Sequence, residues 1–411
     1  MTPPCIPPEL MRANSPCFLP ALGLVNVLGN NPKEVASRLL AGDSTGIWAE
    51  EGWLPGKTAL LGKVHSPLPQ VPKAFPQYAS RCHRLLLAAY MQIEQAVCEA
   101  LERYGKSRVG IVLGTSNSGI AEGESAIEAH RRSGRLPEGY HYSQQELGAP
   151  ALFLAGYLGL GGPAYVVSTA CTSSAKALVS ARSLLEHGLC DAVITGGVDA
   201  LCKLTVNGFE ALELLSSSLC NPMSRHRNGI NIGEGAALFL MTRENLPGGA
   251  EVLFYGAGES SDAYHMSAPH PEGLGAQLAL QAALEDAGFP AKEVDYLNMH
   301  ATATPKNDAT ESLAIHRLFP EGLCVSGTKP MTGHLLGAAG ATEVGLCWLA
   351  LQEGEGLLPP HLWDGEEDAQ LPKLNLVKKG DTFARKTNRL CLSSSFAFGG
   401  NNACLLIGDA R

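Results

Sequence analysis

Short apolar runs alternate with segments of helical spacing along most of the chain. The runs Val109–Leu113 and Asp191–Gly196 predict buried parallel strands, because strands covered on both faces need apolar residues throughout. Apolar residues at helical spacing fill Arg84–Tyr104 and Ser173–His187. The segment Leu147–Ala175 lacks charge but is broken by glycine and proline, which favours a buried helix, a turn and a buried strand over a membrane span. Strands that alternate with helices predict an α/β fold with a layered, mostly parallel sheet.

The N-terminal part divides into an extension and the first elements of the fold. Residues 1–16 are rich in proline and have no periodicity, so we predict a flexible extension and a folded part that starts near Cys17. A strand and turn are expected over Phe18–Leu28 and a helix over Pro32–Leu40. Glycine and proline are frequent in Gly42–Pro72, which predicts a surface segment.

A second series of strands and helices repeats the order of the first after residue 250. It is predicted to comprise the strands Val252–Tyr255, Val294–Met299 and Leu323–Ser326 and the helices Leu274–Ala287, Asp308–Leu318 and Leu335–Gln352. The sequence Ser168-Thr169-Ala170-Cys171 before one small-residue helix parallels Gly327-Thr328-Lys329 before another. This echo predicts a duplicated α/β unit with halves at residues 17–250 and 251–411, whose strand ends meet at one site.

Composition and charge narrow the classes of function. Apolar residues make up 45% of the chain and charged residues 17%, as in a compact globular protein. The formal net charge of -9 offers no basic face for phosphates, so no nucleic-acid partner is expected. None of the 12 cysteines forms a CxxC pair and no HxxxH occurs, so the sequence predicts neither a metal site nor a disulfide framework. Met1–Pro20 lacks the apolar core of a signal peptide, and we therefore expect a cytoplasmic protein.

Cys171 stands where a β-branched run ends and a small-residue helix begins. A thiol there would face the N-terminal end of the helix, whose dipole and unpaired N–H groups are expected to lower its pKa and to bind an oxyanion. A nucleophile is one interpretation of this residue. For a single cysteine, a small buried packing residue is the other, and only partners elsewhere in the chain decide between them.

Three further segments bring reactive residues to the ends of predicted strands. His300 follows one strand in a loop of small residues, and Lys329 and His334 follow the next strand. The third segment, Ser393–Asn402, carries two glycines before the last predicted strand, Ala403–Ile407. Taken alone, each histidine is also consistent with a packing residue, and the glycine pair with an ordinary turn.

Together the four segments resemble the β-ketoacyl-acyl carrier protein synthases, the condensing enzymes of the thiolase superfamily. The resemblance runs from about Cys17 to the C-terminus, and its motifs are Val166–Ala175, Tyr296–Asp308, Val325–Glu343 and Ser393–Asn402. Within the family the chain is similar to elongating synthases with a Cys-His-His triad and, in its overall phrasing, to ketosynthases of bacterial aryl-polyene clusters. The resemblance implies a thiolase-like fold with duplicated α/β halves in an αβαβα arrangement.

The resemblance also implies a role for each matching residue. Cys171 becomes the acyl-accepting nucleophile, and His300 and His334 become the pair that handles malonyl decarboxylation. The other matches are the active-site lysine Lys329, the buried acid Glu343, the charged neighbours Asp308 and Glu311, the threonines Thr302 and Thr304 that hydrogen-bond the phosphopantetheine arm, and the gating residue Phe398, whose N–H joins that of Cys171 in the oxyanion hole. Lys329 either sets the charge state of the site or acts on the released carboxylate, and a structural ion network of Lys329, Glu343 and Asp308 stays an alternative.

These residue types suit a decarboxylative Claisen condensation. A cysteine can accept an acyl group from a thioester and later release it to a carbon nucleophile. Loss of carbon dioxide from malonyl thioester builds negative charge on an oxygen, which two imidazole N–H donors can stabilise without a general base. The expected product is a 3-ketoacyl thioester longer by two carbons. No bound cofactor is expected, because the substrates arrive on the phosphopantetheine arm of acyl carrier protein.

Two other functions are compatible with parts of the sequence. A catalytically silent subunit, similar to the chain-length factors that pair with active ketosynthases, is disfavoured by Cys171 and both histidines. A degradative thiolase would need a second cysteine near the nucleophile, but Cys391 and Cys404 lie outside the Phe396–Gly400 loop.

The resemblance implies protein partners as well. An acidic carrier protein would dock on basic residues, and the candidates are Arg131, Arg132, Arg135, Arg225 and Arg227. Family members dimerise through the sheet edge beside the nucleophile, so a homodimer or a heterodimer with a related subunit is expected.

The chain departs from the family pattern at three positions. Ala301 stands where the family commonly has glycine, which predicts a backbone that tolerates a Cβ. Pro330 removes one N–H donor, and Ala397 is expected to stiffen the gate.

Overall fold

One large sheet forms the centre of the computed structural model, which describes residues 16–410. The predicted extension at residues 1–16 lies outside this range apart from its last residue. Eleven strands pair in the order β12-β11-β10-β13-β14-β9-β1-β8-β6-β4-β5. The strands of the N-terminal part are β1 (Cys17–Val25), β4 (Val109–Gly114), β5 (Ala164–Val167), β6 (Ala192–Asp199) and β8 (Gly235–Thr242). Those of the C-terminal part are β9 (Val252–Ser261), β10 (Tyr296–Asn298), β11 (Cys324–Ser326), β12 (Asn375–Leu376), β13 (Leu390–Ala397) and β14 (Asn401–Asp409).

The two parts of the sheet repeat one topology on either side of a seam. Strands β1 and β9 meet at the seam through two antiparallel residue pairs, Cys17 with Phe254 and Phe18 with Leu253. Moving outward, β8 and β14 run antiparallel to their neighbours, and parallel strands follow, β6-β4-β5 on one side and β13-β10-β11 on the other. The short strand β12 extends the second set at the edge, parallel to β11. The predicted α/β fold is confirmed. We propose that the two halves divide between β8 and β9, at residues 250 and 251.

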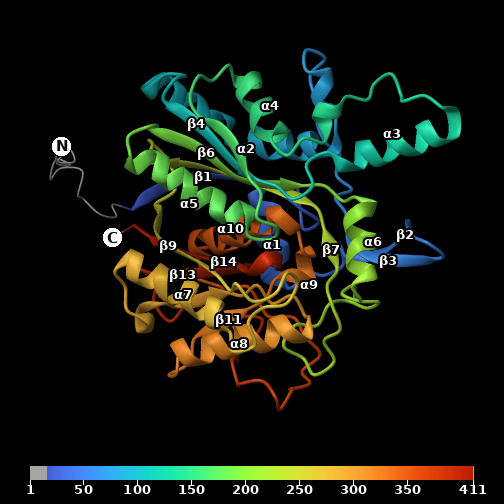
Figure 1. The fold of residues 1–411 in the computed structure, drawn as a ribbon. Helices are drawn as coiled ribbons and strands as arrows, with labels where there is room; N and C mark the ends of the chain where they lie inside the picture. Colours follow the sequence, from blue (N-terminus) through green and yellow to red (C-terminus); the bar gives the residue numbers. More distant parts are fainter. Residues whose placement is uncertain (1–15, 411) are drawn as a thin grey trace, which may run out of the picture.

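Helices cover the sheet in three layers (Figure 1). Helices α2 (Arg81–Tyr104) and α4 (Ala149–Leu158) pack on the outer face of the N-terminal part, and α7 (Leu274–Ala287) and α8 (Pro305–Leu318) pack on that of the C-terminal part. Helices α5 (Ser173–Glu186) and α10 (Ala339–Gln352) lie between the two halves in the central core. Small residues permit this close packing, because a Cβ on Gly340 would stand 2.8 Å from the backbone nitrogen of Ala175. The result is the αβαβα arrangement.

Cys171 and Lys329 occupy equivalent positions in the two halves. Cys171 follows β5 and Lys329 follows β11, and each of these strands is the third parallel strand counted outward from β8 or β14. The echo between the two sequence segments therefore corresponds to the repeated topology. Because the halves pack face to face through α5 and α10, the two strand ends meet in the interior.

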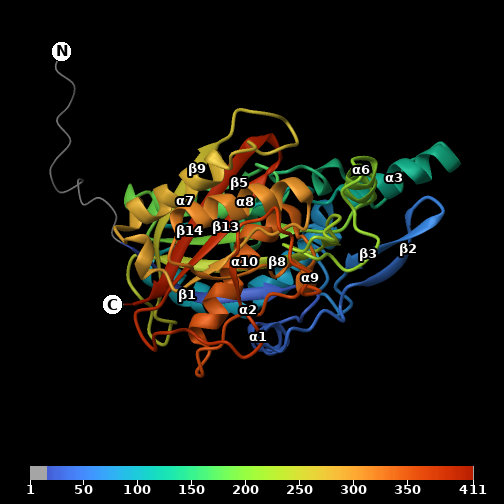
Figure 2. The same cartoon turned by 90° about the horizontal axis from the view of Figure 1, so that it is seen from below.

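The segment predicted as surface contains a β-hairpin. Strands β2 (Trp48–Leu54) and β3 (Lys57–Gly62) pair with each other, and β3 also pairs with β7 (Ile232–Gly233). The hairpin projects from the body next to α6 (Lys203–Ala211) (Figure 2). Most of its side chains are exposed or half-buried, so the alternation of apolar and polar residues that marks a half-buried strand is missing. The remaining helices are α1 (Pro32–Ala41), α3 (Ile120–Ser133) and α9 (Lys329–Thr332).

Gly114 is expected to tolerate no side chain. A Cβ there would clash with the backbone of Ser173 and Ser174 at the start of α5. We expect Gly114→Ala to lower the free energy of unfolding by about 3 kcal/mol in urea titration, at the upper end of overpacking effects. Gly345→Ala in α10 is the matched control, since its nearest neighbour would be 3.5 Å away, and it should gain about 0.5–1 kcal/mol from helix propensity. Equal stabilities of the two variants would contradict the close approach of β4 and α5.

Candidate active site

Loops from both halves bring Cys171, His300 and His334 together in the interior. Nε2 of His334 lies 3.1 Å from Sγ of Cys171. The two imidazole rings stand 5.2 Å apart and nearly perpendicular, at 85°. One ligating atom from each of the three residues falls within 4.8 Å of the others. The three predicted reactive groups thus form one cluster, although they are up to 163 residues apart in sequence.

Cys171 sits in a tight turn between β5 and α5. Ala170 before it has a φ of 53°, the left-handed region that costs a non-glycine residue energy, and its carbonyl accepts a bond from the backbone of Ser173. The thiol is 8% exposed, and burial raises its pKa to about 12, while the charge of Lys329 acts in the opposite direction. The expected lowering of this pKa by the helix is therefore wrong, because removal of water outweighs the favourable charges.

Nε2 of His334 is the protonated ring nitrogen. The N–H of Leu336 donates to Nδ1 at 3.3 Å, so the ring hydrogen lies on Nε2 and points at Sγ of Cys171. Burial lowers the pKa of this imidazole well below its usual value, and Lys329 adds to the effect. His334 is therefore a neutral hydrogen-bond donor to the Cys171 thiol.

His300 is held by an acid from α8. The carboxylate of Glu311 accepts from the N–H groups of His300 and Ala301, both at 2.7 Å, and Ser394 also binds the His300 N–H at 3.1 Å. Burial lowers the pKa of the His300 ring well below its usual range, and Lys329 and His334 lower it further. Nζ of Lys329 lies 3.4 Å from Nδ1, which leaves Nε2–H free to face the cavity.

Lys329 and Glu343 form a buried ion pair behind the histidines. The ammonium group donates to Oε1 of Glu343 and to the carbonyl of His300. The side chains of the pair are 1% and 4% exposed. Burial raises the pKa of Glu343 to about 7, and the neighbouring Lys329 opposes that rise. The pair connects α10 to the loop that carries His300.

Asp308 supports the same loop from a different direction. Its carboxylate accepts from the N–H groups of Met223 at 2.8 Å and Ala303 at 3.2 Å, and burial raises its pKa to about 7. The hydrogen bonds of Asp308 go to the backbone and to Asn307, whereas Lys329 binds Glu343 and His300. Asp308 therefore holds the loop rather than the lysine.

Ala301 adopts a conformation that its side chain makes unfavourable. Its φ is 38°, and Ala303 two residues later has a φ of 60°. The prediction of a backbone that tolerates a Cβ at residue 301 is therefore wrong. The strained loop persists because Glu311 and Asp308 bind its N–H groups. Gly327, which faces Ala301, also leaves space for the Ala301 side chain, since a Cβ on residue 327 would lie 2.4 Å from the Cβ of Ala301.

A cavity of about 400 Å³ leads to the cluster. Its wall includes Cys171, His300 and His334, together with Thr302, Thr304 and Phe398. The hydroxyl groups of the two threonines are 2.9 Å apart. The ring of Phe398 packs against Phe209 of α6, with centroids 5.6 Å apart. The remaining lining residues are Leu212, Glu213, Leu214, Ile230, Asp262, Ser267, Ala268, Pro269, Pro305, Lys306, Asn307, Phe396, Ala397 and Asn402.

Cysteine and histidine are residue types that bind zinc, but the two imidazole rings of this cluster turn N–H hydrogen-bond donors toward the cavity. Zinc binds a neutral imidazole through a nitrogen without hydrogen. In both histidines Nδ1 faces a donor, from Leu336 or Lys329, so the nitrogen that faces the cavity carries its hydrogen. The arrangement suits stabilisation of a negatively charged oxygen better than binding of a cation.

Two family profiles match the chain in sequence order. The β-ketoacyl synthase N-terminal domain matches residues 21–246, and the β-ketoacyl synthase C-terminal domain matches residues 250–362. The chain belongs to the β-ketoacyl synthase family. The resemblance inferred from the four motifs is confirmed, and the protein is an acyltransferase of the condensing type found in fatty acid and polyketide synthesis.

Relatives of the synthase come from bacteria and plants. Nodulation protein E of Rhizobium meliloti is 34% identical over 325 residues, which cover 75% of the synthase and 79% of that protein. The chloroplastic 3-oxoacyl-[acyl-carrier-protein] synthase II of Arabidopsis thaliana is 30% identical over 411 residues, 95% of the synthase and 75% of that protein. A solved structure of the ketosynthase ApeO in complex with its chain length factor ApeC from Xenorhabdus doucetiae contains a chain 44% identical to the synthase. The match covers 96% of the synthase and 98% of that chain, with a TM-score of 0.90.

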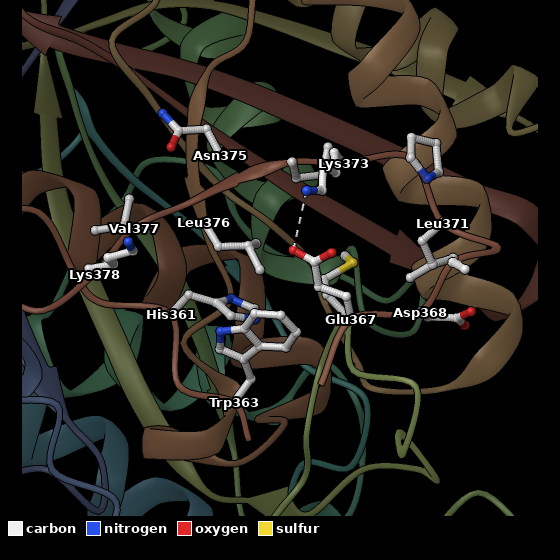
Figure 3. Close-up of a pocket in the computed structure, with 14 residues that line it drawn as sticks. His361, Trp363, Glu367, Asp368, Leu371, Lys373, Asn375, Leu376, Val377 and Lys378 are labelled. Carbon is white, nitrogen blue, oxygen red and sulfur yellow. Dashed lines mark ion pairs between the residues drawn. The ribbon is translucent and has the colours of Figure 1, made fainter. Parts of the chain in front are cut away.

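A second cavity of about 460 Å³ lies beside β12 (Figure 3). His361 in its wall uses both ring nitrogens, because Nδ1 accepts from the N–H of Gly327 at 2.9 Å and Nε2 donates to the carbonyl of Pro222 at 3.0 Å. Lys373 and Glu367 form an exposed ion pair across the opening. Asp368 pairs with Arg227, and Nδ2 of Asn375 donates to Sγ of Cys324. The nucleophile and the two histidine donors line the first cavity, to which we assign the chemistry of the synthase.

Three of the five predicted docking arginines form ion pairs within the synthase itself, and one of these pairs is the exposed contact of Arg132 with Glu128 one turn earlier in α3. Arg227 pairs with Asp368 at 2.6 Å with little exposure, and Arg225 pairs with Glu366. Arg131, Arg132 and Arg135, at the end of α3, are exposed. No helix among residues 16–410 is long and apolar enough to span a membrane.

Sequence reasoning did not single out one buried acid beside the cluster, Asp199. It ends β6 with no exposed surface, and its carboxylate accepts hydrogen bonds from Ser116, Asn117 and Gly337, among others. The only signal in the sequence is an acid that directly follows an apolar strand, a pattern shared by many structural residues.

The raised pKa of Cys171 predicts the pH dependence of its alkylation. Iodoacetamide reacts with the thiolate, whose fraction rises about tenfold per pH unit at any pH well below the pKa. With a pKa of about 12, the alkylation rate should climb steadily from pH 6 to pH 10 without a plateau. Measurement by mass spectrometry, with Cys171→Ala to subtract other thiols, tests this. A plateau near pH 7 would show that the dipole and Lys329 outweigh burial.

Proposed function

We propose that the synthase elongates acyl chains by decarboxylative condensation of a Cys171-bound acyl group with malonyl-acyl carrier protein. The observation that carries this proposal is the contact of 3.1 Å between Nε2 of His334 and Sγ of Cys171, with the His300 ring beside it at the end of a cavity. One nucleophile and two neutral N–H donors are what acyl transfer followed by enolate formation requires.

The first step transfers the acyl group to the enzyme. Sγ of Cys171 attacks the thioester carbonyl, the bond to the pantetheine sulfur breaks, and the proton of the thiol moves to that sulfur. No net proton is taken up, which suits a thiol that is protonated at rest. The N–H groups of Cys171 and Phe398 are proposed to bind the oxyanion.

The second step forms the carbon–carbon bond. The malonyl group loses carbon dioxide, and the electron pair of the broken bond passes to the thioester oxygen as an enolate. The Nε2–H groups of His300 and His334 bind this oxygen, both being neutral because burial lowers their pKa values. The enolate carbon then attacks the acyl carbonyl and Cys171 leaves as a thiolate.

The other predicted residues are assigned supporting roles. Thr302 and Thr304 line the cavity with hydroxyl groups and are proposed to bind the phosphopantetheine arm. Lys329 donates to the carbonyl of His300 and pairs with Glu343, so we propose that it sets the charge and position of the His300 loop. Glu311 and Asp308 are proposed to hold the same loop through its N–H groups.

A related subunit and an acyl carrier protein are the proposed partners. Strand β5 is an edge of the large sheet, and Leu152 and Tyr157 of the neighbouring helix α4 are 53% and 36% exposed. Pairing through this edge would cover both. A chain 44% identical to the synthase comes from a complex of a ketosynthase with its chain length factor, which supports a heterodimer. We propose that the carrier protein docks near Arg131, Arg132 and Arg135.

We further propose a pathway of the aryl-polyene type in the cytoplasm. The pathway is supported by the sequences of the four motifs and by the 44% sequence identity to a chain of the ApeO–ApeC complex. A reducing compartment suits the 11 cysteines of the described residues, all of which are free thiols.

Intact-protein mass spectrometry tests the proposal. The purified synthase is mixed with acyl carrier proteins that bear saturated, polyenoyl or aryl starters, with Cys171→Ala as control. We expect an adduct that the variant lacks and, once malonyl carrier protein is added, a ketoacyl product longer by two carbons. A folded protein that forms no adduct, alone or with a related subunit, would instead indicate a catalytically silent partner.

A further inference from the structure

We propose that Asp199 is a positioning residue that fixes the ring of His334 against Cys171 through the backbone of Leu336 and Gly337. The inference rests on the proposed function in one respect, since it takes the contact between His334 and Cys171 as the reacting pair. Asp199 lies at the end of β6, in the other half of the molecule from His334.

Every contact of the Asp199 carboxylate among the described residues is with an N–H or O–H donor. Oδ1 accepts from Oγ1 of Thr115 at 2.6 Å and from the N–H of Asn117 at 2.8 Å. Oδ2 accepts from the N–H of Gly337 at 2.7 Å, and the N–H of Ser116 lies 3.0 Å from both oxygens. A fully buried carboxylate bound only by such donors organises backbone rather than neutralising a cation.

The hydrogen bond from the N–H of Gly337 to Asp199 positions the neighbouring residue Leu336, whose N–H binds the His334 ring. Leu336, the residue before Gly337, has a φ of 52°, which a bulky side chain disfavours. In this conformation its N–H reaches Nδ1 of His334. The bond from Gly337 to Asp199 holds the strained turn, so without it Leu336 is free to relax and to withdraw its N–H from the ring.

The backbone of His334 is fixed independently of Asp199. Its N–H donates to the carbonyl of Asn231 at 2.7 Å, and its carbonyl accepts from Gly233 at 2.9 Å. Loss of the Asp199 contact should therefore leave the path of the chain unchanged at residue 334. It should alter which ring nitrogen carries the hydrogen and where that hydrogen points.

The same carboxylate reaches the nucleophile turn. Asp199 orders Ser116, and Oγ of Ser116 donates to the carbonyl of Ala170 at 3.3 Å. Ala170, like Leu336, adopts a left-handed backbone conformation, and it directly precedes Cys171. Gly337 must lack a side chain for this arrangement, because a Cβ there would lie 2.7 Å from Oδ2 of Asp199 and 2.6 Å from the Ser116 nitrogen.

The test is Asp199→Asn, which keeps the shape but turns an acceptor into a donor facing an N–H. The ¹⁵N spectrum of the His334 ring, assigned with a His334→Gln variant, should lose the pattern of a single Nε2–H tautomer. Acyl transfer to Cys171 should slow about 100-fold, as for a small misplacement of a reacting group, with KM for the carrier protein unchanged. Thr115→Val, which removes one donor from Oδ1 and leaves the Gly337 contact, should keep the wild-type ring spectrum.

A folded Asp199→Asn protein with the wild-type ring spectrum and acylation rate would overturn the proposal. If that variant does not accumulate as folded protein, Gly337→Ala decides, because its Cβ must separate the carboxylate from residue 337. A wild-type ring spectrum and acylation rate in Gly337→Ala would then overturn it. Failure of the proposed function looks different, since the wild-type protein would show the single tautomer and yet form no condensation product.

Discussion

Replacing His300 with alanine is expected to separate acyl transfer from condensation. The contact to Sγ of Cys171 comes from His334, so the variant should still accept an acyl group at nearly the wild-type rate. Condensation should fall about 10²–10³-fold, the usual effect of removing one donor from a developing oxyanion. Single-turnover mass spectrometry follows the acyl adduct, and release of carbon dioxide from malonyl carrier protein follows the second step.

His334→Ala is the matched comparison for this prediction. It removes the donor to the nucleophile as well as one of the two enolate donors, and should slow both steps. An equal loss of acylation in the two variants would refute the division of labour between the histidines. It would point to a common role in holding the cavity together.

Removing Lys329 is expected to have the largest effect on stability. Lys329→Met leaves Glu343 buried without its partner, and breaking a buried pair in this way costs about 3–5 kcal/mol of unfolding free energy. Burial already raises the pKa of Glu343 to about 7 from 4.5. Loss of the lysine raises the pKa of Glu343 further, because the positive charge that stabilises its ionised form disappears.

The sign of the pH dependence follows from that shift. A carboxyl whose pKa is higher in the folded than in the unfolded state releases its proton on unfolding, so stability falls as pH rises from the unfolded pKa to the folded one. Lys329→Met should therefore be less stable at pH 8.5 than at pH 6 in urea titration. The double variant Lys329→Met with Glu343→Gln removes the titrating charge and should recover part of the loss and lose the pH dependence. A double variant as unstable as the single one would contradict the role of the pair.

The convergence of Cys171, His300 and His334 could be predicted because these residues follow strands that have clear sequence patterns. Val109–Leu113 and Ser173–His187 have strong periodicity, and the structure places β4 and α5 within a few residues of those bounds. Cys171, His300 and His334 each follow such a strand, so their convergence followed from the topology. The family motifs then indicated which of the 12 cysteines to choose.

Properties that depend on distant neighbours could not be predicted. The pKa of Cys171 rises because loops from both halves exclude water from it. Ala301 adopts its strained conformation because Glu311 binds its N–H and Gly327 leaves it space, and neither is adjacent in sequence. Asp199 receives its hydrogen bonds from residues 82 to 138 positions away. Only the folded chain brings such groups together.

The seam between β1 and β9 constrains how the chain folds as it is made. Strand β1 leaves the ribosome before the other described strands, yet it occupies the middle of the finished sheet, between β8 and β9. Both partners lie more than 200 residues further on, from Gly235 and Val252, so β1 waits roughly 10–40 s at usual rates of synthesis. During that interval the apolar residues of β1 are shielded from water only if α2 or a chaperone packs against them. Nascent chains truncated before residue 235 should therefore be prone to aggregation, and the sheet closes only late in translation.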